Sequence, residues 1–313
     1  MAWYSHVVVG YDGLREGERA LRWSVDEARR RRIGLTVCHA WSWPYLEREV
    51  DPSAKRVIRT LAERVLEHGV GLASGLAPRT AVTGRLVEGP VASVLLHESA
   101  RAELVVLGAN GHDEMPLGAT ASRVAARAPC PVIVVRDVGP GDGRIVVGYA
   151  DAVSCSRVLA FGFAEAALQG WRVHLVHGYG AERAPPGAGS GGRADMAELG
   201  RAAGARLERL IAPHRARHPN VDARISITPE PPRRALAGAA AGAQMLAMGD
   251  RVAEGDPPLL LGSTSQAMLL YAPCPVAIVH RNGDSLTRVR PPHPGEAATG
   301  VVVGSPHGEG HLT

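Results

Sequence analysis

The chain carries the same motif twice, and this repeat constrains its fold more than any other feature. An Ala-Pro-Cys-Pro-Val run occupies residues 128–132 and recurs at residues 272–276. Each copy follows a Leu-Gly-x-Thr run, at residues 117–120 and 261–264. A repeat of this length is a whole domain, because the repeating units of solenoids span only ~20–50 residues. The sequence therefore predicts two copies of one domain.

The length of the chain agrees with two domains. Its 313 residues fit two units of about 150 residues each. A Gly- and Pro-rich stretch around residues 137–143 predicts the linker, so we expect the first domain at residues 1–138 and the second at 143–282. Beyond residue 282 the sequence turns to Pro, Gly and His without periodicity, which predicts a disordered tail over residues 283–313.

Apolar runs typical of strands alternate with helical patterns along each half. Parallel strands need a crossover connection, which is normally a helix. This order predicts an α/β fold: two repeated doubly wound, Rossmann-like domains, each with a five-stranded parallel sheet. The expected strands are His6–Gly10, Gly34–Ala40, Thr80–Val87, Leu104–Gly108, Val132–Arg136, Arg144–Gly148, Trp171–His177, Val221–Thr228, Gln244–Gly249 and Val276–His280.

Composition excludes several classes of function. The formal net charge of +4 comes mainly from scattered Arg, and the one dense run, Arg29–Arg32, ends a predicted helix without interleaved aromatic residues. A solvated helix end is therefore favoured over a nucleic-acid site. No apolar run reaches the ~18 residues of a membrane span, and no N-terminal signal pattern precedes the first strand. The four separated cysteines form no CxxC, which is typical of a reducing, cytoplasmic location. Cys130 and Cys274 are expected to be core residues rather than nucleophiles.

Candidate binding residues follow the strands, because ligands of doubly wound sheets lie beyond the carboxyl ends of the strands. Three loops of the first half qualify: Tyr11-Asp12-Gly13, Ala40-Trp41, and the stretch from Gly108 to Gly118. Glycines allow close approach of backbone amides to phosphate, and a helix N-terminus supplies free N–H donors. An acidic residue after the first strand could bind a ribose hydroxyl. Trp41 could stack on a base or pack in the rim, and we expect a packed, hydrogen-bonded histidine at His39.

These residues resemble the universal stress protein family in its tandem form. The resemblance rests on Val9-Gly10-Tyr11-Asp12, on Val37-Cys38-His39-Ala40, on Gly108-Ala109-Asn110-Gly111 leading to Gly118, and on the Ala-Pro-Cys-Pro-Val strands. It covers residues 5 to 282. The resemblance implies the five-stranded fold and bound ATP, with Mg as an accompanying ion. It also implies that Asp12 and the backbone of Ala40 hold the nucleoside, while Gly108, Gly111 and Gly118 line the triphosphate.

Both halves depart from the family pattern. In the first, the segment between Gly111 and Gly118 is three residues short, and Ala119 stands where a hydroxyl is usual, with Thr120 next to it. The second keeps the spacing and the hydroxyls, but Val252 replaces a glycine and Ala150 replaces the Asp. We therefore expect ATP to favour the first domain. The candidate nucleotide-binding residues are Asp12, Ala40, Gly108, Gly111, Gly118, Thr120, Gly249, Gly262, Ser263, Thr264 and Ser265.

Three functions compete as explanations of these residues. The first is a nucleotide-binding stress-response protein that senses or regulates through a protein partner of unknown identity. The alternative is a nucleotide-free interaction scaffold with degenerate sites. An enzyme is disfavoured, because the Walker pattern GxxxxGK[ST] is absent and the sole lysine, Lys55, lies away from any glycine loop. We predict no catalytic residue and no metal site. The repeat predicts an intramolecular pseudo-dimer joined through Val132–Val135 and Val276–Val279, with a homodimer left open.

Overall fold

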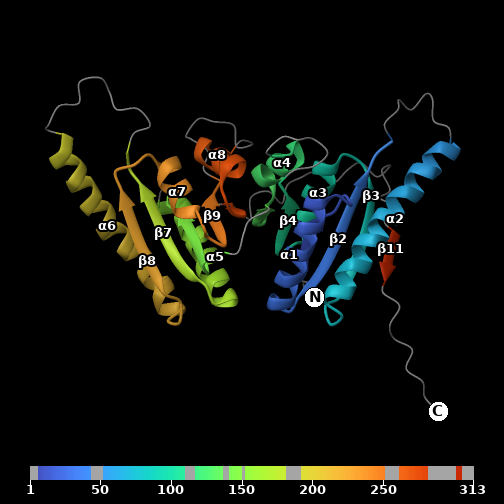
Figure 1. Ribbon diagram of the computed structural model, residues 1–313, viewed down its shortest axis with the longest axis horizontal. Helices are drawn as coiled ribbons and strands as arrows, with labels where there is room; N and C mark the ends of the chain where they lie inside the picture. Colours follow the sequence, from blue (N-terminus) through green and yellow to red (C-terminus); the bar gives the residue numbers. More distant parts are fainter. Residues whose placement is uncertain are drawn as a thin grey trace, which may run out of the picture. The chain divides into compact units, whose positions relative to one another are not determined.

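The computed structural model describes residues 6–43, 52–109, 117–136, 141–149, 152–180, 192–250, 261–280 and 301–304, with backbone alone at 152–155, 192–196 and 301–304 (Figure 1). The chain forms two compact units. Unit 1 contains residues 1–124, 128–130 and 284–313, and unit 2 contains residues 125–127 and 131–283. All ten predicted strands are present, and the predicted α/β fold is confirmed.

Unit 1 is a mostly parallel sheet with the strand order β11-β3-β2-β1-β4. Strand β1 pairs in parallel with both β2 and β4, and β2 pairs in parallel with β3. Its core strands are β-branched and leucine runs that are buried on both faces, as expected for parallel strands covered by helices. The elements are β1 (His6–Gly10), α1 (Arg15–Arg31), β2 (Gly34–Trp41), α2 (Pro52–Leu76), β3 (Val82–Glu88), α3 (Val91–Ser99), β4 (Leu104–Gly108), α4 (Ala119–Arg127), whose last three residues belong to unit 2, and β11 (Val301–Gly304).

Close contacts assign the helices of unit 1 to the two faces of its sheet. A Cβ atom on Gly84 of β3 would lie 3.0 Å from the Val70 side chain of α2. A Cβ atom on Gly10 of β1 would instead lie 3.3 Å from Leu95 of α3. Helix α1 packs beside α2 and contacts β1 and β4. Helices α1 and α2 therefore cover one face, and α3 covers the other.

The arginine run at the end of α1 is a solvated helix terminus, as the sequence indicates. Arg31 bonds to the buried carboxylate of Glu27 and, at 2.7 Å, to Glu103. Arg29 pairs at 3.0 Å with Asp26 one turn away. Arg32 closes the helix in the left-handed conformation, with φ of 58°. The cations thus neutralise local acids and complement the helix dipole.

Unit 2 repeats the architecture with the strand order β5-β10-β9-β6-β7-β8. Pairings among β6, β7, β8, β9 and β10 are parallel. Helix α5 faces Val147, because that side chain would lie 2.6 Å from a Cβ atom on Gly162. The elements are β5 (Val132–Val135), β6 (Arg144–Gly148), α5 (Ala152–Gln169), β7 (Arg172–Gly178), α6 (Gly192–Arg217), β8 (Ala223–Thr228), α7 (Pro232–Ala240), β9 (Met245–Gly249), α8 (Ser263–Tyr271) and β10 (Val276–Val279).

The last strands of the two repeats pair with each other, which confirms the expected strand pairing. Strand β5 runs antiparallel to β10, with Ile133 opposite Ala277 and Val134 opposite Val276. All four residues of each strand are buried. The compact units consequently divide the chain at other positions than the sequence repeat does. Strand β5 comes from the first repeat, yet it belongs to unit 2.

The segment after residue 282 differs from the expected structureless tail at four residues. Strand β11 pairs antiparallel with β3, with Val301 opposite Leu86 and Gly304 opposite Thr83. Three consecutive valines favour the extended conformation. The pairing covers the edge of β3, which would otherwise present unpaired backbone groups. The Pro- and Gly-rich composition of the surrounding residues concealed this short strand from sequence analysis.

The β5–β10 pairing predicts the effect of a cavity in β5. The substitution Ile133→Ala should destabilise unit 2 by about 2–5 kcal/mol, the usual cost of removing this buried side chain. Hydrogen exchange measured by mass spectrometry should show faster exchange of the amides of residues 276–279. The control Val57→Ala, at a residue that is 60% exposed on α2, should change neither. Unaltered exchange in β10 would contradict the assignment of β5 to unit 2.

Candidate functional site

The carboxylate of Asp12 lies at the carboxyl end of β1, against the first turn of α1. Its Oδ1 atom accepts a hydrogen bond of 2.9 Å from the backbone N–H of Leu14. A Cβ atom on Gly17 would collide with the same oxygen, so this glycine allows the carboxylate to approach the helix. The second carboxylate oxygen makes no hydrogen bond among the described residues. Asp12 is half-buried and keeps one acceptor available at the rim.

The backbone of Ala40 is open toward β1. In an extended strand the N–H and C=O of one residue point to the same neighbour, and these directions alternate along the chain. The Cys38 carbonyl accepts the N–H of Tyr11 at 2.9 Å, whereas the Trp41 carbonyl accepts the N–H of Gly89 at 2.8 Å. Ala40 therefore points toward β1, as Cys38 does. The β1–β2 pairing ends at Cys38, so both polar groups of Ala40 face the open end of the sheet.

The aromatic side chains on either side of Ala40, those of His39 and Trp41, contact other parts of the protein. His39 Nδ1 bonds at 2.7 Å to the Tyr11 carbonyl, which confirms the expectation of a packed, hydrogen-bonded histidine. Trp41 is 8% exposed. The Lys55 ammonium lies 5.9 Å from the Trp41 ring centroid and 2.7 Å from a carboxylate oxygen of Glu88. Of the two readings open from sequence, these contacts favour rim packing of Trp41 over base stacking.

The glycine at the end of β4 has a structural reason to be glycine. A Cβ atom on Gly108 would lie 2.8 Å from the backbone oxygen of Glu16 in α1. Gly118, on the far side of the loop, donates its N–H at 2.8 Å to the carbonyl of Ala109. That amide is therefore used to close the loop and is not presented to a ligand. Gly111 lies outside the described residues.

The N-terminus of helix α4 is the candidate anion-binding feature of unit 1. Gly118 is its N-cap, and no side chain caps the helix. The first N–H groups of an α-helix have no partner within the helix. The amides of Ala119, Thr120 and Ala121 are thus the donors at this terminus, and the half-buried Thr120 adds a hydroxyl. Together with Asp12 and Ala40, this terminus completes the carboxyl edge of unit 1.

The matching edge of unit 2 is more closed. Gly178, in the position of Ala40, packs so closely under the loop before α7 that a Cβ atom would lie 2.8 Å from the Glu230 oxygen and 3.0 Å from the Pro232 Cα atom. Asp250 follows Gly249 where unit 1 has Ala109. A carboxylate at this position repels a phosphate. Sequence analysis overlooked Asp250, although aligning Gly249 with Gly108 reveals it.

The hydroxyls of α8 serve different purposes. Gly262 is the uncapped N-cap residue of this helix. Ser265, which is 3% exposed, donates its hydroxyl at 2.8 Å to the carbonyl of Gly249 and thereby holds the helix to the end of β9. Ser263 is exposed and Thr264 half-buried at the start of the helix. Among the three predicted binding residues Ser263, Thr264 and Ser265, it is therefore Ser265 whose hydroxyl is used in a hydrogen bond within the protein. Ala150 and Val252 lie outside the described residues.

Thiol and metal chemistry find little support in the described part of the chain. Burial raises the pKa of the thiols of Cys38, Cys130 and Cys274 to about 12, so they are protonated core residues, as expected. No group of three His, Cys, Asp or Glu side chains that could hold a metal occurs among the described residues. None of the helices described is long and apolar enough to cross a membrane.

Comparison with known proteins identifies both repeats. The model of the universal stress protein family matches residues 4–136 and again residues 143–280. Universal stress protein Rv2005c of Mycobacterium tuberculosis is 27% identical over 297 residues, covering 88% of this chain and 97% of the relative. Rv2624c of the same organism is 28% identical over 284 residues, covering 88% and 96%. A crystal structure of a universal stress protein from Archaeoglobus fulgidus shares the fold, with a TM-score of 0.63, 18% identity, and coverage of 89% and 99%.

The bond between Ser265 and Gly249 predicts a stability effect without a ligand. The substitution Ser265→Ala should lower the free energy of unfolding by about 0.5–1.5 kcal/mol, because it removes the hydroxyl that donates to the part-buried carbonyl of Gly249. Ser263→Ala, at the exposed position of the same turn, should change it by less than about 0.5 kcal/mol. Urea denaturation followed by circular dichroism measures both. Equal effects of the two substitutions would show that the Ser265 bond carries no special weight.

Proposed function

The chain belongs to the universal stress protein family, and from this premise we propose that it binds an adenine nucleotide, ATP foremost, at the carboxyl edge of unit 1. The observation that carries the proposal is the open backbone of Ala40 beside the half-buried carboxylate of Asp12. Adenine presents a donor and acceptors along its edges. A backbone N–H and C=O of one residue match such an edge, and a carboxylate suits a ribose hydroxyl.

The phosphates of the nucleotide would contact a different element from the nucleoside. They would lie at the N-terminus of α4, where uncapped amides and the helix dipole favour negative charge. Gly118 contributes only its conformation, since its N–H is bound to Ala109. The triphosphate would bring any Mg²⁺ with it, because the described residues contain no group of three His, Cys, Asp or Glu side chains that could hold a metal ion. Binding is then carried mainly by backbone groups.

Unit 1 is the favoured unit for three reasons. It keeps the acidic residue at the end of β1, whereas the second repeat has Ala150 there. It has Ala109 where unit 2 places the carboxylate of Asp250. Its residue Ala40 is half-buried, whereas Gly178 is buried under the loop before α7. Each difference weakens nucleotide binding in unit 2, through a lost hydrogen bond, through charge repulsion and through crowding.

The proposed role is that of a sensor or regulator in the stress response rather than a fast enzyme. Its nucleotide state would be read by a protein partner in the cytoplasm, in keeping with three buried free thiols. Backbone amides that bind ground state and transition state equally give affinity without rate. The second candidate is a nucleotide-free scaffold, which the loss of the Gly118 amide to Ala109 favours. Nucleotide titration separates the two.

Calorimetric titration of the full chain with ATP tests the site. The substitution Asp12→Asn keeps an oxygen for the Leu14 amide but removes the charge, so it should raise the Kd of ATP roughly threefold to tenfold. Asp12→Ala should raise it further. As a matched pair, Thr120→Ala in α4 should weaken binding, whereas Thr264→Ala at the same position of α8 should leave the Kd unchanged. Absence of ATP binding in the wild type would favour the scaffold, and sensitivity to Thr264→Ala alone would move the site to unit 2.

Turnover should be slow even where ATP binds. Enzymes typically reach ~1–1000 turnovers per second, and we expect less than about one per second. The sole lysine, Lys55, pairs with Glu88, and the described residues at the start of α4, Gly118 to Ala121, include no base that could act on the γ-phosphate. A coupled assay of phosphate release measures this. Faster hydrolysis that Asp12→Ala abolishes would contradict a non-enzymatic role. A substitution at Gly108 could not replace Asp12→Ala in this assay. A side chain at position 108 would clash with the backbone of α1 and disturb the fold itself.

A further inference from the structure

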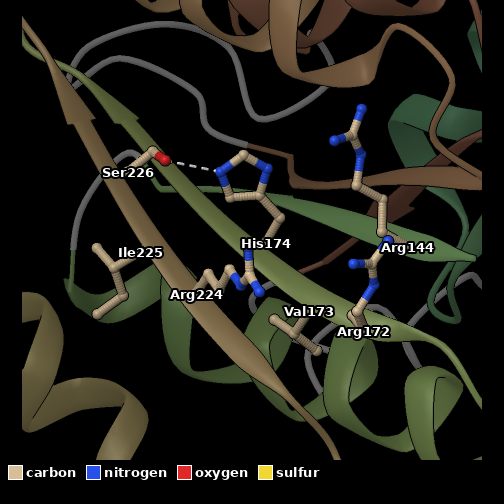
Figure 2. Close-up of a pocket in the computed structure, with 7 residues that line it drawn as sticks. All are labelled: Arg144, Arg172, Val173, His174, Arg224, Ile225 and Ser226. Carbon is tan, nitrogen blue, oxygen red and sulfur yellow. Dashed lines mark hydrogen bonds between the residues drawn. The ribbon is translucent and has the colours of Figure 1, made fainter. Parts of the chain in front are cut away.

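A hollow of about 280 Å³ lies on the sheet of unit 2, at the amino ends of β6, β7 and β8 (Figure 2). This is the end opposite to the candidate nucleotide edge. Along β7, residues 172 and 178 are separated by about 20 Å at the usual rise of a strand. The hollow is therefore separate from that edge. Its lining residues are Arg144, Arg172, Val173, His174, Arg224, Ile225 and Ser226.

The polar lining residues share one face of the sheet. Arg144 is in register with Arg172, and His174 is in register with Arg224. Residues two apart on a strand also share a face, which adds Ser226. It is the face that α7 covers toward the other end, because a Cβ atom on Gly148 would lie 3.2 Å from Leu236 of that helix. Beyond the reach of α7, the face is left to cationic side chains.

The hollow holds an excess of positive charge. Arg144 pairs with Asp142 at 3.3 Å and donates at 2.6 Å to the carbonyl of Ala241. Arg224 pairs more loosely with Asp222, at 3.7 Å, and its side chain is 74% exposed. Arg172 donates at 3.1 Å to a backbone oxygen and forms no ion pair among the described residues. Three guanidinium groups thus face two carboxylates at the margin.

His174 lies among these cations. Its Nε2 atom and the hydroxyl of Ser226 are 2.8 Å apart, as the dashed line in Figure 2 shows. Burial lowers the pKa of His174, the charges of Arg144 and Arg224 lower it further, and Asp142 opposes them. The second ring nitrogen makes no hydrogen bond among the described residues. An anion in the hollow would relieve the repulsion that the imidazolium meets there.

The first repeat shows that the fold does not require this cluster. The positions of His174 and Arg224 are those of Thr36 and Thr83 in unit 1, where the two hydroxyls are 3.1 Å apart. Gly34 and His6 stand where unit 2 has Arg172 and Arg144. A pair of small neutral side chains is therefore compatible with the same sheet architecture. The cations of unit 2 are additions that the architecture leaves unexplained.

We propose that this hollow binds a small anion that carries a phosphate group, held by Arg144, Arg172, Arg224 and His174. Guanidinium forks bind phosphate oxygens in pairs, with charge-assisted hydrogen bonds. The volume suits a compact molecule, being close to the lower limit of about 300 Å³ for ligand pockets. A nucleic acid fits less well, because Asp142 and Asp222 flank the cations and no Phe, Tyr or Trp is among the residues that line the hollow.

Titration of the full chain with inorganic pyrophosphate at constant ionic strength tests the proposal. The wild type should bind it, and the double substitution His174→Thr and Arg224→Thr should weaken binding at least tenfold. This variant copies the pair that unit 1 already accommodates, so its fold should be retained. Arg172→Gln should act in the same direction without touching the other positions. Arg209→Gln is the control for net charge and should bind as the wild type does. It removes an exposed arginine from α6, which packs on the other face of the sheet, because a Cβ atom on its Gly204 would lie 3.2 Å from Ile227.

A proton NMR titration of the imidazoles adds a readout of position. The His174 signal, assigned by its loss in the double variant, should show a higher pKa in the presence of pyrophosphate than in its absence. Absence of binding by the wild type at millimolar concentration, equal weakening by Arg209→Gln, or an unmoved pKa of His174 would overturn the proposal. Citrate that bound as tightly as pyrophosphate would overturn the phosphate class. Because these variants leave Asp12 and α4 intact, the result is separable from the fate of the nucleotide proposal.

Discussion

The structure depends on the burial of short parallel strands on both faces. Aliphatic runs such as Val7-Val8-Val9 are shielded from water only if helices cover both faces of the sheet. Each connection between parallel strands then crosses over through a helix. That constraint gathers every strand-to-helix loop at the carboxyl edge. It also determines where backbone groups are left open, because β1 ends before β2 does. The free polar groups of Ala40 are a direct consequence.

The two repeats differ at positions that tolerate different residues without a change of fold. Unit 1 keeps an acid and open backbone at its carboxyl edge, whereas the same edge of unit 2 carries Asp250 and a covered Gly178. Unit 2 instead gains cations at the opposite end of its strands, where unit 1 has the Thr36–Thr83 pair. The proposed sites thus differ between the two copies of one architecture: the one in unit 1 lies at the carboxyl ends of its strands, and the one in unit 2 lies at the amino ends of its strands.

Strand runs, helix alternation and the repeat gave the fold class, the ten strands and the β5–β10 pairing, because these follow from periodicity and the burial of apolar residues. The roles of individual loop residues did not follow in the same way. Gly108 is glycine because of the Glu16 backbone, and the Gly118 amide closes a loop. Ser265 serves the Gly249 carbonyl. Such roles depend on distances between segments remote in sequence. The cluster around His174 escaped notice for the same reason, since its arginines are scattered along the chain.

The open backbone of Ala40 is the proposed place of the adenine base. Hydrogen exchange with and without saturating ATP, resolved to single amides, tests this. Bound ATP should slow the exchange of the Ala40 amide and of the first amides of α4, and it should leave the Gly178 amide and α8 unchanged. Protection at Gly178 and the start of α8 in place of unit 1, or no protection in either unit under conditions where ATP is saturating, would contradict it.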